Sequence, residues 1–450
     1  MNKIITITST LLLLSNITIA QELTYPIVGT NQTLFFDNAN IIEAPQKGDV
    51  FYGQDANFQH NTPNYTDNGD GTITDNITGL VWQKDFKLLS YEEAIEEARK
   101  CTLGGKSDWR VPTIKEAYSL IIFSGTDASN RDMTKVPEGA IPFIDTDYFV
   151  FEYGSNGTRV IDTQMLSTTF NISSSERQKN IFGVNIADGR IKCYPMNTRD
   201  GGKKYTVRLV SGNAYGENQF VDNKDKTISD KATGLMWQKE DSGKGMNWEE
   251  ALKYAEKMNK QNYLGYNDWR VPNIKELQSI VDYSRSPEIT SSPAIDPVFE
   301  TTKIKNEAGE ADYPFFWSST THCSTSLRNM GSAAAYISFG RGLGNMQQGM
   351  GMAQSQGQQR QGQGQRQGMN GQNQGQGQRQ GMNSQGQQRQ GQNNSRSNNT
   401  STPNWINIHG AGSQRSDPKS GDASSYTGGR GPQGDAIRID NFVRLVRYEK

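Results

Sequence analysis

The chain has 450 residues, a formal net charge of −1 and three cysteines. So few cysteines exclude a disulfide-built scaffold, and the near-zero net charge gives no reason to expect a nucleic-acid partner. Beyond the first twenty residues, no apolar run reaches the roughly 18 residues that a transmembrane helix needs, so we expect no membrane span.

The N-terminus has the pattern of an export signal. Lys3 precedes an apolar run over residues 4–14, and Ala20 ends the stretch with a small side chain that suits cleavage. We therefore interpret residues 1–20 as a signal peptide and expect an exported protein that is periplasmic, cell-surface or secreted. No cysteine directly follows Ala20, so a lipid anchor is not expected.

One long pattern then occurs twice in the same order. Its four strings cover residues 67–75, 78–84, 108–112 and 207–210 in the first copy, and 222–230, 233–239, 268–272 and 443–446 in the second. A period of about 150 residues is too long for a solenoid repeat. We therefore predict two tandem domains, residues 21–212 and 213–450, each with its own core.

Each copy predicts the same elements. Residues 72–75 and 80–83 flank a glycine-containing turn and indicate a hairpin. Two helices follow, because a cap residue stands three positions before a glutamate in four places. These pairs are Ser90 with Glu93, Thr113 with Glu116, Asn247 with Glu250 and Asn273 with Glu276. Strands are then expected at residues 181–186 and 207–210, so each copy is predicted to be an α+β domain with a mainly antiparallel sheet.

The cysteines leave two interpretations open. Cys101 and Cys193 lie in the same copy and a bridge between them is possible, which would leave Cys323 unpaired. Alternatively, Cys101 is a buried apolar residue, because the second copy has Met258 at the matching helical position.

A low-complexity insert interrupts the second copy. Residues 344–402 are nearly all Gln, Gly, Asn, Ser, Met and Arg, a composition that predicts disorder. Strand-like residues 334–339 and 405–408 flank the insert, so we interpret it as an expanded loop inside a domain. Lengthening a loop tenfold costs only about 2 kcal/mol.

Several strings carry a family resemblance. These are Tyr-Gly-Gln-Asp-Ala at 52–56, Asp-Trp-Arg-Val-Pro in both copies, Trp-Ser-Ser-Thr at 317–320, and the glycine-rich stretches 410–419 and 431–438. The chain resembles the Lcl C-terminal-type domain, a bacterial family of unknown function. The family's namesake is part of a collagen-like adhesin that binds sulfated glycans.

More distantly, the chain is similar to C-type-lectin-like and formylglycine-generating domains. That similarity implies two tandem C-type-lectin-like domains of α+β class, each with two helices. It does not imply oxidase chemistry, because neither copy has a suitable pair of reactive cysteines.

The first hairpin also suggests a metal site. Asp67, Asn68, Asp70 and Asp75 place several oxygens close together, as a Ca²⁺ loop does. The bidentate glutamate of an EF-hand is missing, however, and Lys224 in the second copy replaces a glycine of the first. A turn leading into a hairpin explains the same residues, so Ca²⁺ and turn both stay open.

Catalytic patterns are weak. The chain has three histidines, His60, His322 and His409, and no Gly-x-Ser-x-Gly elbow, so we expect no enzyme. Arg110 and Arg270 stand between a tryptophan and a Val-Pro pair, which favours an internal ion pair or carbonyl clamp over a ligand contact.

Polar side chains on glycine-rich loops of the second copy are the best candidates for ligand binding. They are Arg341, His409, Gln414, Arg415, Lys419 and Arg430. Guanidinium groups suit sulfate or carboxylate groups of a glycan. Alternatively, Arg415 and Asp417 hold each other and the loop.

Our leading hypothesis is an exported, non-enzymatic binding module for glycans, such as a sulfated polysaccharide, or for cell-surface material, with the second domain as reader. The alternative is a structural envelope protein whose insert drives self-association.

Overall fold

The computed structural model describes residues 23–155, 158–174, 179–198, 201–345, 403–431 and 433–449. The chain is α+β, with many short strands and few helices. The expected signal peptide, residues 1–20, and nearly all of the expected insert, residues 346–402, lie outside the described residues. Within the described residues, no helix is long and apolar enough to cross a membrane.

The helices begin where the capping pairs predict. They are α1 (Tyr91–Lys100), α2 (Ile114–Ser119), α3 (Trp248–Lys260) and α4 (Ile274–Ser279), with short 3-10 turns η1 (Asp55–Asn57), η2 (Leu103–Gly105), η3 (Tyr263–Gly265) and η4 (Ala423–Tyr426). At each α-helix the cap side chain accepts the glutamate's backbone N–H, and the glutamate carboxylate accepts the cap's own N–H. All four predicted capping boxes are therefore confirmed, and each is worth about 1 kcal/mol.

The described residues form 24 short strands. They are β1 (Phe35–Phe36), β2 (Ile41–Ile42), β3 (Tyr65–Asp67), β4 (Thr72–Asp75), β5 (Val81–Gln83), β6 (Lys87–Leu89), β7 (Gln164–Phe170), β8 (Asn180–Asn185), β9 (Arg190–Pro195), β10 (Asn197–Thr198), β11 (Gly201–Gly202), β12 (Tyr205–Val207), β13 (Val210–Ser211), β14 (Phe220–Asp222), β15 (Thr227–Asp230), β16 (Leu235–Gln238), β17 (Ile304–Lys305), β18 (Ala311–Asp312), β19 (Phe315–Thr321), β20 (Ala333–Ser338), β21 (Leu343–Asn345), β22 (Trp405–Asn407), β23 (Gln414–Pro418) and β24 (Val446–Tyr448). The predicted hairpin is confirmed as β4 and β5. The loop that carries the insert lies between the paired strands β21 and β22, inside the second copy as predicted.

The strand expected at residues 207–210 is broken. β12 pairs with β6 and β7 of the central sheet, whereas β13 pairs with β5 of a peripheral sheet. Arg208 stands between the two strands, and its guanidinium donates inward to the backbone carbonyls of Gln83, Lys84 and Asp85. The buried guanidinium thus holds the carbonyl groups at the end of β5 at the point where the chain changes sheets.

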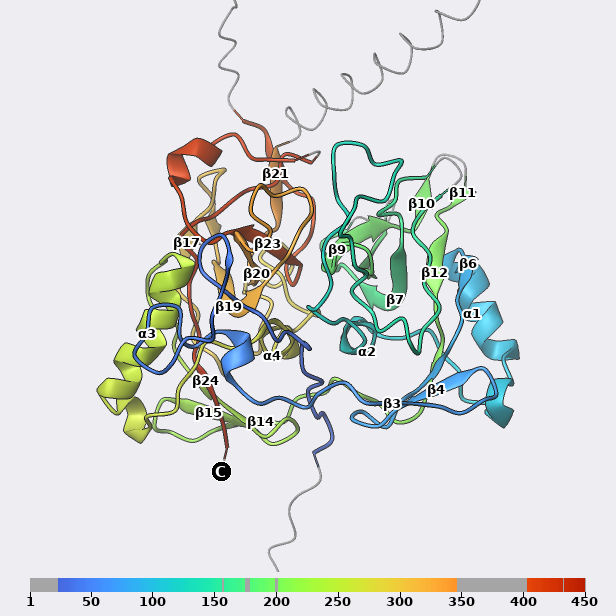
Figure 1. Ribbon diagram of the computed structural model, residues 1–450, viewed down its shortest axis with the longest axis horizontal. Helices are drawn as coiled ribbons and strands as arrows, with labels where there is room; N and C mark the ends of the chain where they lie inside the picture. Colours follow the sequence, from blue (N-terminus) through green and yellow to red (C-terminus); the bar gives the residue numbers. More distant parts are fainter. Residues whose placement is uncertain are drawn as a thin grey trace, which may run out of the picture.

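The two copies share one central sheet of eight strands, in the order β19-β20-β23-β9-β8-β7-β12-β6. β7, β8 and β9 of the first copy take the places that β19, β20 and β23 take in the second. β9 and β23 pair antiparallel, with Ile191 opposite Gln414. The first copy lies on the right of Figure 1 and the second on the left, with the shared sheet between α1 and α3.

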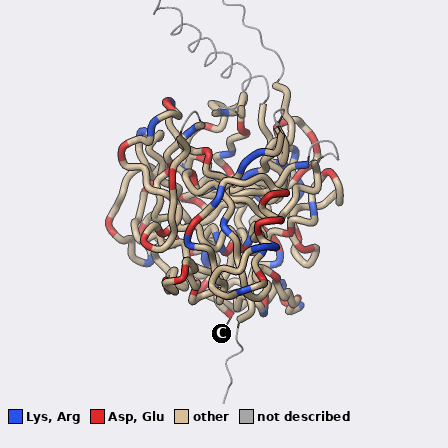
Figure 2. The backbone as a smooth tube through the Cα atoms, turned by 90° about the vertical axis from the view of Figure 1, so that its right-hand side faces the viewer, with Lys and Arg blue, Asp and Glu red and all other residues tan. Residues whose placement is uncertain are grey.

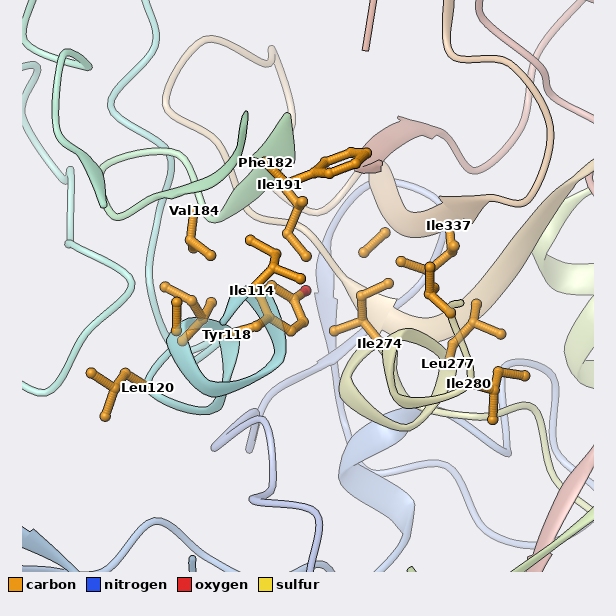
Figure 3. Packing of buried hydrophobic residues seen from close by; sticks show 14 of the residues in the cluster. Ile114, Tyr118, Leu120, Phe182, Val184, Ile191, Ile274, Leu277, Ile280 and Ile337 are labelled. Carbon is orange, nitrogen blue, oxygen red and sulfur yellow. The ribbon is translucent and has the colours of Figure 1, made fainter. Parts of the chain in front are cut away.

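The prediction of a separate core for each domain is wrong at the centre. α2 and α4 lie side by side under the sheet, and one cluster of buried side chains joins both copies (Figure 3). Ile114 and Tyr118 belong to the first copy, and Ile274, Leu277 and Ile337 to the second. Separate clusters lie under the outer helices α1 and α3, and a small one around Ala128, Ile161 and Ala187 lies in the first copy. β9 and β23 are the strands at which the two copies meet in the central sheet. Because they pair with each other, neither copy leaves this sheet edge unpaired, and the two copies pack together.

Two lysines bind the copies together reciprocally. Lys115 of α2 donates to the carbonyl of Ser279 at the end of α4, at 2.8 Å, and Lys275 of α4 donates to the carbonyl of Ser119 at the end of α2, at 2.7 Å. Both side chains satisfy carbonyls that a helix end leaves free. Burial lowers the pKa of Lys115 to about 8 and that of Lys275 to about 7.

We expect this burial to make stability depend on pH. Between the folded pKa of Lys275, about 7, and the usual unfolded value of about 10.4, the unfolded chain binds more protons than the folded chain. The free energy of unfolding should therefore rise between pH 7 and 9, by about 2 kcal/mol more in the wild type than in Lys275→Met. Urea unfolding at pH 7, 8 and 9 measures the difference; exposed Lys257→Met is the control and should follow the wild type.

The Cys101–Cys193 bridge is absent, because all three cysteines are free. Cys101 contacts the cluster under α1, whereas Cys193 on β9 packs against the shared central cluster. The alternative, an apolar role for Cys101, is the one that the structure supports.

Candidate functional site

A cleft of about 810 Å³ lies over the central sheet where the two copies meet. We call it the junction cleft and define it by three floor residues, Arg190, Lys192 and Arg415, and three rim residues, Arg159, Arg328 and Arg430, all of which line it. Four of these six side chains come from strands or loops that the sequence analysis did not connect with ligand binding.

The floor follows from strand alternation. Ile191 of β9 is buried in the shared core and lies opposite Gln414 of β23. Successive side chains point to opposite faces of a sheet, so Arg190 and Lys192 face the other way, into the cleft. By the same register, Arg415 stands opposite Arg190, which places a guanidinium from each copy at the junction.

Carboxylates hold the first-copy cations in place. Arg190 donates to Asp127 at 2.7 Å and to the hydroxyl of Ser416 at 3.0 Å. Lys192 donates to Asp188 at 2.9 Å. The contact with Ser416 crosses the junction, so the floor is a composite of both copies.

The second-copy floor is a buried triad of Arg415, His409 and Asp435. Arg415 pairs with one carboxylate oxygen of Asp435, and His409 Nε2 lies 2.7 Å from the other. Burial lowers the pKa of His409 to about 4, with the charge of Arg415 as the second cause, so this histidine is neutral at pH 7. Burial alone would raise the pKa of Asp435, but Arg415 and His409 outweigh it and lower that pKa.

The predicted pair of Arg415 with Asp417 is wrong. Asp417 instead accepts the backbone N–H of Arg438 at 2.8 Å. Burial raises the pKa of Asp417 to about 8. Arg415 pairs instead with Asp435, on the loop that follows β23.

The rim carries the accessible charges. Arg328 and Arg430 are exposed, and within the described ranges neither guanidinium forms an ion pair. Arg430 lies 5.9 Å from the centre of the Tyr426 ring. Arg159 is held by Asp162 at 2.7 Å. The cleft lining contains six cationic side chains against two carboxylates, Asp127 and Asp435, although acidic and basic positions are interspersed along the chain as a whole (Figure 2).

The other predicted ligand residues lie elsewhere. Arg341 pairs with Glu288 at 2.8 Å, outside the cleft. Gln414 is buried on the opposite face of the sheet. Lys419 is fully buried, donates to the carbonyl of Asp37 and lies 3.9 Å from the Trp248 ring. Of the six predicted residues, the structure therefore brings only Arg415 and Arg430 to the cleft surface, with His409 behind Arg415.

Sequence reasoning missed Arg159, Arg190, Lys192 and Arg328. The alternation of Arg190 and Lys192 in a strand was a usable signal for two cations on one face. Their position beside the second copy was not visible, because it depends on the pairing of β9 with β23.

The residues of the proposed Ca²⁺ loop have partners in the turn. Asp67 pairs with Lys84 at 2.6 Å, Asp70 accepts from Thr72, and the side-chain amide of Asn68 donates to the hydroxyl of Thr72. Asp75 is buried and accepts the backbone N–H of Ile77 at 2.9 Å. In the part of the chain that is described, no group of three or more His, Cys, Asp or Glu side chains could hold a metal. These contacts support the interpretation as a turn.

The arginine of each Asp-Trp-Arg-Val-Pro string forms an internal ion pair, one of the two expected contacts. Arg110 lies 2.7 Å from Glu116, and Arg270 lies 2.5 Å from Glu276. Each glutamate is also the capping-box residue of its helix, so one carboxylate serves both contacts.

A family model described as the Lcl C-terminal domain matches residues 71–211 and 226–358. No curated protein and no solved structure matches the chain. The first match includes β9, with Arg190 and Lys192. The second match ends before β22, so Arg415 and Arg430 lie beyond it.

Proposed function

Because this chain belongs to the Lcl C-terminal domain family and carries the domain twice, we propose that it is a non-enzymatic binding module for anionic glycans. The ligand occupies the junction cleft, and its sulfate or carboxylate groups contact the exposed arginines of the rim. A C-type-lectin-like fold of each copy and export to the periplasm, cell surface or medium are parts of the same proposal.

One observation carries this proposal. Arg328 and Arg430 stand exposed at the rim without acidic partners in the described part of the chain, above a floor that already holds three further cations. A planar guanidinium donates two parallel hydrogen bonds to a sulfate or carboxylate group. Tyr194 and Tyr426 also line the cleft and offer ring faces to a sugar.

The composite floor changes the expected location of the site. The sequence favoured the second domain alone as reader, whereas Arg190, Lys192 and Arg159 come from the first copy. A ligand in the cleft would contact both copies at once. We therefore expect neither copy to reproduce the affinity of the full chain.

We expect the double substitution Arg328→Ala/Arg430→Ala to weaken retention on a sulfated-glycan column. Exposed charge contacts contribute roughly 0.5–1 kcal/mol each, so affinity should fall by about tenfold and elution should move to lower salt. The matched control is Arg99→Ala/Lys257→Ala, which removes two exposed cations from the outer helices α1 and α3.

The control separates the cleft from net charge. If both double variants elute at the same reduced salt concentration, binding depends on overall charge and the cleft is not the site. Unchanged retention of Arg328→Ala/Arg430→Ala would also contradict the proposal.

A further inference from the structure

The two copies contain the same groove, and among the described residues an extended segment packs along the outer helix only in the second copy. Its walls are the outer helix, α1 or α3, the Trp-Arg pair that follows it, and the start of α2 or α4. In the second copy, residues 51–60 of the N-terminal segment occupy the groove; this segment appears in blue beside α3 in Figure 1. Residues 51–60 belong to the predicted first domain, residues 21–212, but they pack on the second copy. The predicted domain boundary therefore does not describe how this segment packs.

Aromatic and small residues anchor the start of the segment. The ring of Phe51 stacks on that of Trp248, with centroids 6.4 Å apart. Gly53 has a φ of +98°, and a side chain there would approach Leu252 of α3. Glycine therefore suits this position for its backbone conformation rather than for space, since a Cβ would lie at an ordinary contact distance of 3.8 Å from Leu252.

Polar contacts fix the rest of the segment. Asp55 is fully buried and accepts a hydrogen bond from the hydroxyl of Thr320 at 2.5 Å. Arg270 lies between two rings, 5.5 Å from Phe58 and 4.8 Å from Tyr448. The segment thus presents an aromatic residue, a glycine, an aspartate and a second aromatic residue at positions 51, 53, 55 and 58.

The first copy has the same groove wall; residues 214–218 line its end near α2, and within the described residues nothing equivalent to residues 51–58 packs along α1. Its equivalents of Trp248, Leu252, Arg270 and Thr320 are Tyr91, Ile95, Arg110 and Thr169. The Arg110 side chain is 34% exposed, against 3% for Arg270. Tyr91, Ile95 and Thr169 are half-buried, whereas their second-copy equivalents are buried. A cavity of about 900 Å³ lies here, lined by Ile95, Arg110 and Thr169.

The two threonines show what the first groove lacks. The hydroxyl of Thr320 accepts the N–H of Ile274 at 3.0 Å and donates its own proton to Asp55. The hydroxyl of Thr169 accepts the N–H of Ile114, also at 3.0 Å, but within the described ranges its proton has no acceptor. Arg110 also lines this groove. Its guanidinium pairs with Glu116 and donates to the carbonyls of Gly212 and Asn213, and its exposed part is the cation that an incoming carboxylate would meet. Lys115 does not add to it, because its ammonium group already has its own acceptors.

We propose that the first-copy groove binds an extended segment of a separate protein with the pattern aromatic-x-Gly-x-Asp-x-x-aromatic. The chain's own residues 51–58 show this chemistry in the equivalent groove. They are not the occupant of the first groove, because their aspartate is buried against Thr320. The bound aspartate accepts the Thr169 proton, and the second aromatic residue covers the open face of Arg110.

A peptide with the sequence of residues 50–61, labelled with fluorescein, tests this proposal on the full chain by fluorescence anisotropy. We expect saturable binding at one site per chain. Changing the peptide's aspartate, equivalent to Asp55→Asn, should weaken binding by about tenfold, because a buried charged hydrogen bond is lost. Replacing the second aromatic residue, equivalent to Phe58→Ala, should weaken it similarly.

Protein variants locate the site. Ile95→Glu should abolish binding, whereas Leu88→Glu, which adds the same charge at an exposed position on β6 outside the groove, should not change it. If Ile95→Glu disturbs folding, Thr169→Val keeps the shape and should still weaken binding about tenfold.

Three results would overturn the proposal. One is no binding of the peptide at millimolar concentration. Another is binding that Ile95→Glu leaves intact, since the peptide would then exchange into the second copy's groove. The third is a concentration-dependent dimer in light scattering that Ile95→Glu disrupts, since the occupant would then be a second copy of this chain. None of these results bears on glycan binding in the junction cleft.

Discussion

We expect Arg444→Met to lower the free energy of unfolding by about 4 kcal/mol. Arg444 is buried, and its guanidinium donates to the backbone carbonyls of Gln238, Lys239, Glu240 and Glu300. The guanidinium also lies 5.0 Å from the centre of the Phe299 ring. Methionine fills a similar volume but leaves these carbonyls without a donor, and this loss outweighs the avoided cost of burying a charge.

The midpoint of urea unfolding measures the effect of Arg444→Met. Arg208→Met should behave alike, because Arg208 makes the same set of contacts in the first copy, to the carbonyls of Gln83, Lys84, Asp85 and Val150. Arg99→Met is the control: this arginine is exposed, so its loss should change stability by less than about 0.5 kcal/mol. A midpoint unchanged in Arg444→Met would show that the carbonyl contacts contribute no net stability.

The second large effect concerns the N-terminal segment. We expect Asp55→Ala to lower the free energy of unfolding by about 3 kcal/mol, because Asp55 is buried between Thr320 and His60, and its removal leaves both polar groups without their acceptor. Residues 51–60 should detach first. Hydrogen exchange of their backbone amides should therefore speed up more than exchange in β20, which lies in the central sheet.

The contribution of this segment should also fall as pH rises. Burial alone would lower the pKa of His60, but Asp55 and Glu276 outweigh burial, so the pKa is raised above its usual 6.5. Stability from protonated His60 is fully present below pH 6.5 and is lost as pH rises through the folded pKa. The difference in unfolding free energy between the wild type and His60→Ala should therefore shrink from pH 5.5 to pH 8.5. A difference that stays constant or grows would show that the carboxylates do not stabilise the histidine cation.

Local patterns predicted the local structure of both copies well. Ser90, Thr113, Asn247 and Asn273 cap helices because a short polar side chain and a glutamate three residues later satisfy each other's backbone groups, whatever surrounds them. The hairpin at β4 and β5 follows for the same reason, since Asp75 binds the N–H groups of its own turn. The internal duplication also predicted that each such element appears twice.

The candidate site was predicted only in part. Two of the predicted ligand residues line the junction cleft: Arg430 from a glycine-rich loop, where binding side chains collect, and Arg415 from strand β23. Lys419 was chosen on the same pattern but is buried beside Trp248, and Arg341 is held by Glu288. Loop composition predicts that a polar side chain lies near the end of a strand. It does not predict whether that side chain reaches the surface or is covered by another part of the chain.

The sequence by itself determined the α+β class, the two copies, the helix starts and the position of the insert inside the second copy, because these features depend on residues close together in the chain. Only the tertiary structure decided that β9 pairs with β23, that the two copies share a core, and that residues 51–60 pack on the second copy. These contacts join residues more than 150 positions apart, and their energy comes from burial and from the pairing of sheet edges, which have no local sequence pattern. The junction cleft and the open groove beside α1 are both consequences of that long-range packing.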